Sequence, residues 1–396
     1  MLPLTGVTIL AVEQYGAGPF GSMLCADLGA DVIKIEPPGE EGELGRRVGP
    51  YFFGPKNSHF FQAFNRNKRS ITLDLKSPEG AEIFRNLAKG ADAVLDNLRG
   101  DQPEKLGLTY RHLAEINPGI VCAHLSAYGR DGPRKSWPGF DYLMQAEAGY
   151  LSVTGEPDGP PARMGLSIVD FMTGLMTVFA MTSAIIGARA SGRGEDVDVS
   201  LFDTALHNLS YLAVWYLNGG HVQGREPRSG HPSLTPSQLY RTRDGWIFIM
   251  INKENFWAPL CEAIGRPEWV HDGRFATFKA RLENRMVLNR QLDEALSART
   301  TSEWMTVFAG KVPAAPVLDI KEALDNPFVA EREGVRTFEG SPHGAPLRMV
   351  ASPIRIPGEE LPARAAPGLG ADTEDILSGI GLTAEQVAEL RRRGIV

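Results

Sequence analysis

Residues 6–12 read Gly6-Val-Thr-Ile-Leu-Ala-Val12, a short β-branched and aliphatic run near the start of the 396-residue chain. Such a run, without alternating polar positions, is typical of a strand buried on both faces of a parallel sheet. It is followed by Gly16-Ala-Gly18-Pro-Phe-Gly21, then by an expected helix over Ser22–Leu28 and a second apolar run over Ala30–Glu36. This order predicts the first unit of a doubly wound α/β domain.

The first turn formally matches the dinucleotide-binding fingerprint, because Glu36 follows its glycines by about 20 positions. Two features disagree with that function. Pro19 removes a backbone N–H at the helix start, where a pyrophosphate would bind. Pro37-Pro-Gly39 then replaces the expected continuation. We therefore expect a different ligand at the switch point of the sheet. A nucleotide-binding protein without turnover remains an alternative from another functional class.

Strands and helices continue to alternate, which supports a parallel sheet with right-handed crossovers. Further strands are expected over Ile71–Leu75, Ala93–Asn97, Ile120–Leu125 and Asp196–Leu201, and helices over Ser77–Lys89, Tyr110–Asn117, Phe140–Gln145 and Phe202–Leu217.

The composition then divides the chain. Residues 1–218 form the first part of a large α/β domain, and residues 219–236, rich in Gly, Pro, Arg and Ser, form a linker or an active-site loop. Residues 237–330 form a smaller α+β domain with a hairpin at Arg243-Asp-Gly245. Residues 331–396 return to the large domain and end in a helix over Thr383–Arg393.

The totals restrict the function. The 41 basic and 48 acidic residues give a net charge of −7, which does not favour nucleic-acid binding. The cysteines Cys25, Cys122 and Cys261 have neither metal-ligand nor disulfide spacing, which suits a reducing cytoplasm. No signal-peptide pattern is visible at the N-terminus. We expect a cytoplasmic protein without a metal.

Phe171–Ala188 contains no charged residue and reaches the length of a membrane span. Thr173, Gly174 and Thr177 interrupt its apolar character. We expect a helix buried in a large core or in a dimer interface, with no membrane partner.

Asp170 lies just before this helix in Met164-Gly-Leu-Ser-Ile-Val-Asp170-Phe-Met-Thr-Gly174. A carboxylate among apolar residues is costly to desolvate unless it has a role. It can be the N-cap of the helix, worth about 1 kcal/mol. It can also be a poorly solvated nucleophile or base. The pattern alone leaves both open.

Basic residues surround two turns. Lys68, Arg69 and Lys76 flank one expected strand, and Arg99 and Lys105 flank the following turn. They either bind a ligand with several phosphates or are solvated loop charges.

A series of landmarks along the chain resembles class III coenzyme A (CoA) transferases, from residue 4 to Arg393. This family includes formyl-CoA transferase, carnitine CoA-transferase and α-methylacyl-CoA racemase. The landmarks are Leu4-Thr-Gly-Val-Thr-Ile-Leu, Gly18-Pro, Gly29-Ala-Asp-Val-Ile-Lys-Ile-Glu36, Asn67-Lys-Arg-Ser70, Leu73-Asp-Leu-Lys76, Asp96-Asn97, Leu106-Gly, Gly129-Arg-Asp-Gly-Pro133, Asp170, Gly192-Arg-Gly, Glu303-Trp304 and Val312-Pro-Ala-Ala-Pro-Val317.

The resemblance implies a fold and an activity. The fold is a Rossmann-like large domain with a parallel sheet, built from both chain ends, plus a smaller α+β domain, in an interlocked homodimer. The activity, a transfer of sulfur-containing groups, moves CoA from an acyl-CoA thioester to a carboxylic acid, and small organic or dicarboxylic acids are expected. Acyl-CoA and the acceptor acid are then the partners, and no tightly bound cofactor is expected.

Asp170 matches the family's catalytic aspartate, which attacks the thioester and passes through an aspartyl anhydride to an aspartyl-CoA thioester. The family's CoA contacts, with two further positions near the active site, fall on Gly16, Ala17, Leu73, Asp74, Leu75, Lys76, Asn97, Leu98, Arg99, Lys105, Phe140 and Asp141.

Three positions depart from the family pattern. Pro37 replaces an arginine that contacts the nucleotide, and Gly16 replaces a frequent glutamine. Phe140 stands where the racemases carry a histidine base. Racemisation needs a base on each face of the α-carbon, so an acyl-CoA racemase or epimerase using Asp170 is the second choice.

The roles of five other polar residues stay open in the sequence. Asp141 either orients substrate or caps its helix, and His231 belongs to an active-site flap or an exposed loop. His124 is expected to be a satisfied core residue. Arg46 and Arg47 either bind the free end of a dicarboxylate or are solvated.

Overall fold

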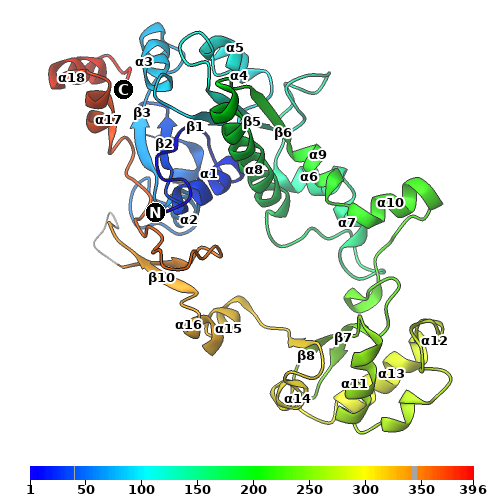
Figure 1. The fold of residues 1–396 in the computed structure, drawn as a ribbon. Coiled ribbons are helices and arrows are strands. Elements are labelled where there is room, and N and C mark those ends of the chain that lie inside the picture. Colours follow the sequence, from blue (N-terminus) through cyan, green and yellow to red (C-terminus); the bar gives the residue numbers. More distant parts are fainter. Residues whose placement is uncertain (40, 341–345) are drawn as a thin grey trace. The chain divides into compact units, whose positions relative to one another are not determined.

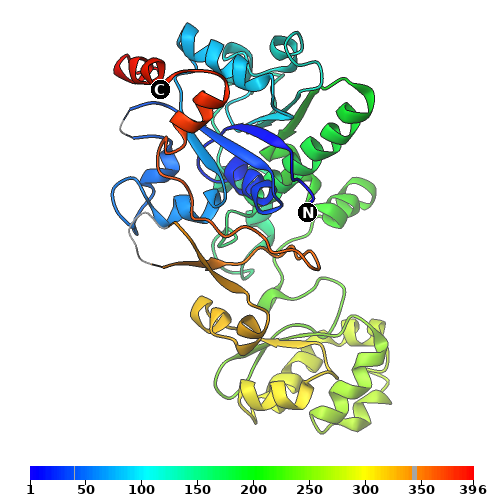
Figure 2. The ribbon, with the colours of Figure 1, turned by 60° about the vertical axis from the view of Figure 1, so that its left-hand side comes forward.

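The computed structural model describes residues 1–39, 41–340 and 346–396 (Figure 1). These residues form two compact units. The first comprises residues 1–148, 165–210 and 328–396, and the second comprises residues 149–164 and 211–327. The first unit therefore contains both ends of the chain, and Figure 2 shows its C-terminal helices, in red, beside N-terminal elements in blue and cyan.

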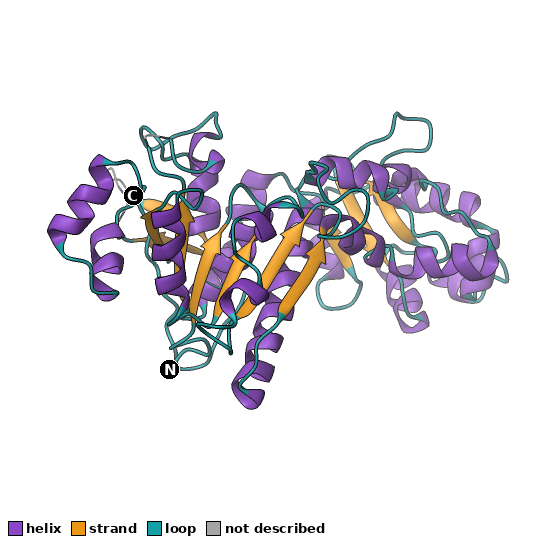
Figure 3. Ribbon diagram, turned by 90° about the horizontal axis from the view of Figure 1, so that it is seen from above, coloured by secondary structure: helices purple, strands orange, loops and turns teal. Residues whose placement is uncertain are grey.

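The first unit is built on a six-stranded parallel sheet whose order is β3-β2-β1-β4-β5-β6. Figure 3 shows the strands as neighbouring orange arrows. This is the doubly wound order, in which the chain reverses direction between β1 and β4 and leaves a crevice at their carboxyl ends. The strands are β1 (Thr8–Val12), β2 (Asp31–Glu36), β3 (Arg69–Thr72), β4 (Ala93–Asp96), β5 (Val121–Ser126) and β6 (Asp196–Ser200).

The C-terminal part contributes no strand to this sheet within the described ranges. The six strands lie within Thr8–Ser200, whereas the unit as a whole includes both chain ends. The C-terminal part supplies helices α17 (Thr373–Gly379) and α18 (Ala384–Arg392), and the separate hairpin of β10 (Val335–Phe338) and β11 (Leu347–Val350).

Helices cover both faces of the sheet. On one face, α1 (Ala17–Asp27) and α8 (Ile168–Ser191) pack on Ile9 and Leu95. On the other face, α3 (Pro78–Ala88), α17 and α18 pack on residues that include Leu10 and Val94. The remaining helices of this unit are α2 (His59–Asn65), α4 (Gln102–Lys105), α5 (Tyr110–Leu113), α6 (Asp141–Glu147), α9 (Leu201–His207) and α16 (Pro327–Glu331), whose first residue belongs to the second unit.

The second unit has its own three-stranded antiparallel sheet, in the order β7-β8-β9. As predicted, β7 (Ser237–Arg241) and β8 (Trp246–Met250) form a hairpin closed by the Asp-Gly turn. β9 (Ala314–Pro316) completes the sheet. Helices α11 (Trp257–Ala263), α13 (Arg285–Leu296) and α14 (Thr301–Phe308) enclose a core with it. The other helices are α7 (Tyr150–Val153), α10 (Ser210–Gly219), α12 (Phe278–Glu283) and α15 (Ile320–Leu324).

Three helix predictions were inaccurate. Helix α1 begins at Ala17 rather than Ser22, and it tolerates Pro19 because the first-turn N–H groups have no partner inside a helix. The helix expected over Phe202–Leu217 is divided into α9 and α10, and Ser210 has a φ of 50° at the break. Helix α5 ends at Leu113 rather than Asn117.

Helix α8 is long and apolar enough to cross a membrane by length and composition only, and core helices of soluble proteins pass the same test. Its buried residues Thr173, Thr177, Met181 and Ile185 recur at four-residue intervals and form one face. That face belongs to the core of the first unit, as expected from the sequence.

Candidate active site

Asp170 lies in the first turn of α8, not at its N-cap, which is Ser167. Of the two roles that the sequence pattern left open for Asp170, the N-cap of this helix is therefore excluded. Asp141 has that role from another helix: its Oδ2 accepts the backbone N–H of Val169 at 2.7 Å and of Asp170 at 3.0 Å. Gln145 donates to the other oxygen of Asp141 at 2.6 Å. Asp141 is thus held against the first turn of α8 and does not cap its own helix α6.

Asp170 lines a cavity of about 280 Å³ at the carboxyl ends of β1, β4 and β5. This is the crevice where doubly wound proteins bind their ligands. Four segments supply most of the wall: 14–17 after β1, 97–99 after β4, 125–127 at the end of β5, and 138–140 before α6.

Glycines bring the first loop into direct contact with the helix of Asp170. A Cβ at Gly16 would lie 2.9 Å from Oδ2 of Asp170, so the backbone there approaches the carboxylate as closely as a chain can. A Cβ at Gly174 would lie 2.4 Å from the carbonyl oxygen of Ala17, which shows that α8 and α1 touch through their backbones. This close approach fixes the distance between Asp170 and the loop that contains Gly16 and Ala17.

Asp170 is buried without a cation. Its side chain is 8% exposed, and no ion pair to it occurs within residues 1–39, 41–340 and 346–396. Burial raises the pKa of Asp170 to about 7, and the negative charge of Asp141 adds to the shift. A carboxylate that is largely buried and unpaired is a stronger nucleophile or base than one in bulk water.

The loop opposite Asp170 is held by polar side chains. Oδ1 of Asn97 accepts the N–H of Gln14 at 2.8 Å, and Nδ2 of Asn97 donates to the carbonyl of Gln14 at 2.7 Å. Glu43 accepts the N–H of Tyr15 at 3.1 Å. The backbone of this wall is therefore set before any ligand binds.

The structure brings together only part of the predicted CoA site. Gly16, Ala17, Asn97, Leu98, Arg99 and Phe140 line the cavity with Asp170. Lys105 lines another cavity, of about 720 Å³, which is also lined by Gly100, Arg130 and Lys135. Leu73, Asp74, Leu75 and Lys76 line neither cavity: Leu73 and Leu75 pack in the core, and Asp74 N–H donates to the carbonyl of Ile395.

Several basic residues proposed as ligand contacts are already paired. Lys68 is buried and donates to Glu13 at 2.7 Å, and Arg69 pairs with Asp31 and Asp375. Neither matches the phosphate-binding expectation. Arg99 and Lys105 remain half exposed or more, although both contact Asp101.

The two arginines considered for a dicarboxylate also have partners. Arg46 is 2% exposed and donates to both oxygens of Glu36, at 2.7 and 2.6 Å, so it is neither solvated nor open to substrate. Arg47 pairs with Glu41 at 2.5 Å.

His231 belongs to the second unit, in the loop before β7. Its Nδ1 accepts the backbone N–H groups of Ser233 and Leu234, each at 3.2 Å. Burial lowers the pKa of His231, with Arg285 contributing. The ring is therefore neutral at pH 7 and carries its proton on Nε2.

Sequence reasoning missed some cavity residues. Gln14 and Tyr15 follow β1, Ser126 ends β5 and Ala127 follows it, so their places at strand ends were a usable signal. Leu44 comes from the Gly- and Pro-rich loop after β2, where no pattern indicates a ligand.

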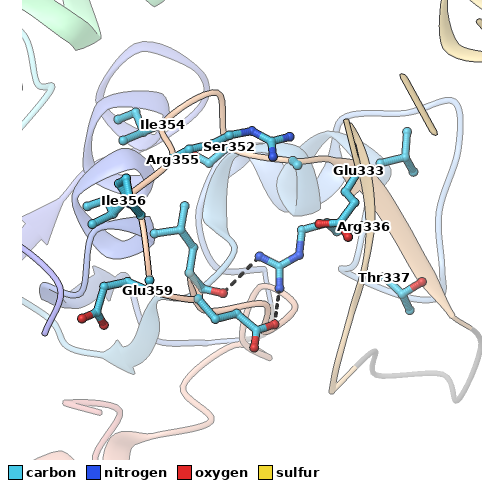
Figure 4. A pocket seen from close by; sticks show the side chains of 14 residues that line it. Glu333, Arg336, Thr337, Ser352, Ile354, Arg355, Ile356 and Glu359 are labelled. Carbon is cyan, nitrogen blue, oxygen red and sulfur yellow. Dashed lines mark hydrogen bonds and ion pairs between the residues drawn. The ribbon is translucent and has the colours of Figure 1, made fainter. Parts of the chain in front are cut away.

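A third cavity, of about 850 Å³, lies along β10 and the segment that follows β11 (Figure 4). Its Arg336 donates to the carbonyl of Leu361 at 3.1 Å and pairs with Glu360 at 2.9 Å. Arg355 donates to the carbonyl of Arg332. Because both arginines already have acceptors, we do not place the active site there. Within the described residues, no group of three His, Cys, Asp or Glu side chains is arranged to hold a metal ion.

The fold and the first cavity define a doubly wound α/β protein with a ligand site at its switch point and a lone buried carboxylate on the wall of that site. A family description of CoA-transferase family III matches residues 4–373. The chain belongs to this family. It is an enzyme that moves CoA from an acyl-CoA thioester to a carboxylic acid.

Known relatives agree over nearly the whole chain. It is 32% identical to a succinate–glutarate CoA-transferase of Agrobacterium fabrum, covering 95% of both chains. It is 34% identical to an acetyl-CoA:oxalate CoA-transferase of Acetobacter aceti, covering 91% of this chain and 90% of the relative. A solved CAIB/BAIF family protein from Brucella suis superimposes with a TM-score of 0.83 at 31% identity, over 96% of this chain and 99% of that one.

Proposed function

We propose that Asp170 is the nucleophile of this CoA-transferase and that transfer passes through covalent aspartyl intermediates. The observation that carries this proposal is the position of Asp170: its carboxylate is buried, has no paired cation among the described residues, and lies on the cavity wall opposite a fixed loop. A carboxylate in this setting is reactive as an anion and is protected from water.

The reaction then balances without a redox or metal step. A carboxylate oxygen of Asp170 attacks the thioester carbonyl and expels the CoA thiolate, which forms a mixed anhydride. The thiolate attacks the Asp170 carbonyl, releases the donor acid and forms an aspartyl-CoA thioester. The acceptor carboxylate attacks that thioester and expels the thiolate, which leaves a second mixed anhydride. The thiolate then attacks the acceptor carbonyl of this anhydride, which yields the new acyl-CoA and free Asp170. Backbone N–H groups at the start of α1 stabilise the oxyanions.

CoA binds with its two ends in different places. A volume of about 280 Å³ is at the lower limit for a small-molecule pocket. We therefore assign it to the acyl group and the adjacent part of the pantetheine arm. The phosphates lie outside it, near the exposed cations Arg99 and Lys105. Leu73–Lys76 remain family-based candidates for more distant contacts.

The acceptor is a small dicarboxylic acid. Relatives that act on glutarate and oxalate support this substrate class. The cavity wall supports transfer over racemisation, because Asp170 is the only carboxylate or imidazole that lines it within the described residues. Phe140, which is 55% exposed at the cavity, cannot be the second base that a racemase needs.

The working form is a cytoplasmic homodimer. Leu175, Phe179 and Ile186 on α8 are 48%, 68% and 71% exposed, which leaves one face of this apolar helix for a partner. In the domain division that we propose, 1–218 and 331–396 form the CoA-binding domain, 237–330 form the smaller domain, and 219–236 are the linker or loop that joins them along the chain.

The test is a transfer assay with a panel of CoA donors and dicarboxylic acceptors. We expect one donor and acceptor pair to give ping-pong kinetics, because the donor acid leaves before the acceptor reacts. Sequential kinetics for every active pair would contradict the covalent route. Deuterium exchange at the α-carbon without CoA transfer would instead establish the racemase.

A further inference from the structure

His124 bridges two carboxylates inside the sheet. It lies in the middle of β5, is 1% exposed, and pairs in register with Asp96 of β4. Its Nδ1 lies 2.6 Å from Oδ2 of Asp96, and its Nε2 lies 2.9 Å from Oδ1 of Asp196 at the start of β6. The sequence-based expectation of a satisfied core residue is confirmed, but its partners are two acids.

This geometry fixes the protonation state of the ring. A neutral imidazole has one N–H, so one ring nitrogen would direct a lone pair at a carboxylate oxygen. An imidazolium donates at both nitrogens. Burial alone disfavours the charged ring, but the bonds to Asp196 and Asp96 raise the pKa of His124 to about 9. His124 therefore carries a buried positive charge at neutral pH.

The bridge continues to the wall of the active-site cavity. Oδ1 of Asp96, the oxygen that His124 does not contact, accepts the N–H of Leu98 at 3.3 Å. Leu98 lies between Asn97 and Arg99 in the turn that lines the cavity. Asn97 in turn holds the backbone of Gln14 through two hydrogen bonds. His124 is thus connected to both loops that face Asp170.

We propose that His124 is a positioning residue for CoA binding: its protonated ring holds Asp96, and through it the Asn97–Arg99 turn, in the geometry that receives the pantetheine arm. The proposal rests on the placement of CoA in this cavity. His124 does not line the cavity, so it acts through Asp96 and does not contact substrate.

Other charges around the ring determine the effect of removing its proton. From the loop after β5, Arg130 pairs with Asp198 and lies 3.4 Å from Asp196. From α5, the backbone N–H of Tyr110 donates to Asp196 at 2.8 Å. With both cations present, Asp96, Asp196 and Asp198 each have a cationic partner. Deprotonation of His124 removes the charge between Asp96 and Asp196, and the buried Asp96 then lacks a counter-charge.

The direction of the pH effect is set by the raised pKa. The stabilisation from His124 is complete below its unfolded pKa of about 6.5 and is lost as pH rises through about 9. Affinity for CoA should fall as the pH rises through about 9, because the fraction of protein with a formed Asn97–Arg99 turn falls there.

The experiment uses the full-length protein and a CoA thioether, which has no thiol to titrate and is not turned over. Isothermal titration gives its Kd between pH 7 and pH 10, and ¹⁵N NMR of labelled histidines gives the pKa of the His124 ring. We expect both ring nitrogens to be protonated at pH 7.5. We expect the Kd to rise about tenfold or more, with its midpoint at the pKa of the ring.

The variant Asp196→Asn separates positioning from simple structural support. It removes one of the two carboxylates, so the pKa of the ring falls, and the midpoint for CoA binding should fall by the same amount. His59→Gln is the matched control, because His59 is an exposed histidine of α2 stacked on Phe53. Its midpoint should equal that of the wild type. If Asp196→Asn does not fold, the wild-type protein still tests the proposal, because the pH midpoint of CoA binding is compared with the pKa of its His124 ring.

Two results would overturn the proposal in different ways. A CoA affinity that stays constant while the His124 ring titrates would remove His124 from CoA binding and leave the chemistry of Asp170 untouched. Absence of CoA binding at every pH would contradict the placement of CoA in the cavity, on which both proposals rest. Because binding is measured without turnover, failure of the aspartyl mechanism alone does not affect this test.

Discussion

The carboxylate of Asp141 caps the helix that carries Asp170, through hydrogen bonds of 2.7 and 3.0 Å to the first N–H groups of α8. The same carboxylate places a negative charge next to Asp170 and contributes to its raised pKa. One side chain therefore anchors the proposed nucleophile and tunes its protonation. Removing the charge while keeping the two hydrogen bonds to α8 separates the two effects.

Asp141→Asn should move the acid limb of the pH–rate profile to lower pH. An asparagine oxygen still accepts the N–H groups of Val169 and Asp170, but the neighbouring charge is gone, so the pKa of Asp170 falls below about 7. The reactive form is the anion, and its fraction at pH 5–6 therefore rises. The measurement is kcat/KM from pH 5 to 9, and an unchanged profile would show that Asp141 has no electrostatic role.

Asp170→Asn should abolish transfer and stabilise the fold at pH 8. The pKa of Asp170 is higher in the folded state than its ordinary 3.8, so its contribution to stability is complete below about pH 4 and is lost as pH rises through about 7. We expect a gain of about 2 kcal/mol at pH 8, within the limit of about 4 kcal/mol that the full shift implies. Urea unfolding at pH 8 and pH 4 measures this, and an equal difference at both pH values would contradict the assignment.

Gly174→Ala should be destabilising although alanine favours helices. The new Cβ would lie 2.4 Å from the carbonyl oxygen of Ala17, so α1 must move away from α8. Overpacking of this kind costs about 1–3 kcal/mol, and the displaced first loop should also lower kcat. Gly187→Ala on the same helix is the matched control, because nothing lies within 4 Å of its Cβ position. Equal unfolding midpoints for the two variants would show that the backbone contact between Gly174 and Ala17 does not limit the size of the side chain.

Lys105→Ala should raise KM for acyl-CoA about tenfold with little change in kcat, because a lost phosphate contact weakens ground-state and transition-state binding equally. The effect should shrink at high ionic strength. Lys76→Ala is the comparison, because Lys76 is also a family-based CoA contact but lines neither of the cavities at the sheet edge. A larger effect from Lys76→Ala would show that the phosphates bind along the segment after β3.

The sequence predicted the elements whose signals are local. The β-branched runs predicted the parallel strands, and the helix expected to start at Ser77 is α3, which Ser77 caps by accepting the N–H of Gly80 at 3.0 Å. The Asp-Gly turn likewise predicted the β7–β8 hairpin. These features depend on residues within a few positions of one another, so a single sequence is sufficient to find them.

The polar contacts that shape the site depend on partners far along the chain. Asp141 caps a helix that begins at Ile168, and Lys68 is neutralised by Glu13, so neither role is visible in the local pattern. The His124 bridge had a usable signal, since Asp96 and Asp196 fall on neighbouring predicted strands. Which side chains meet still depends on strand order and register, and only the structure supplies these.

The most direct test of the central claim is chemical trapping of the enzyme during turnover. The protein is incubated with the acyl-CoA donor that supports transfer, treated with hydroxylamine or borohydride, and examined by intact mass and peptide mapping. We predict a modification on the peptide that contains Asp170, and its absence from Asp170→Asn under the same conditions. Turnover without any trapped adduct, or an adduct on a different side chain, would contradict Asp170 as the nucleophile.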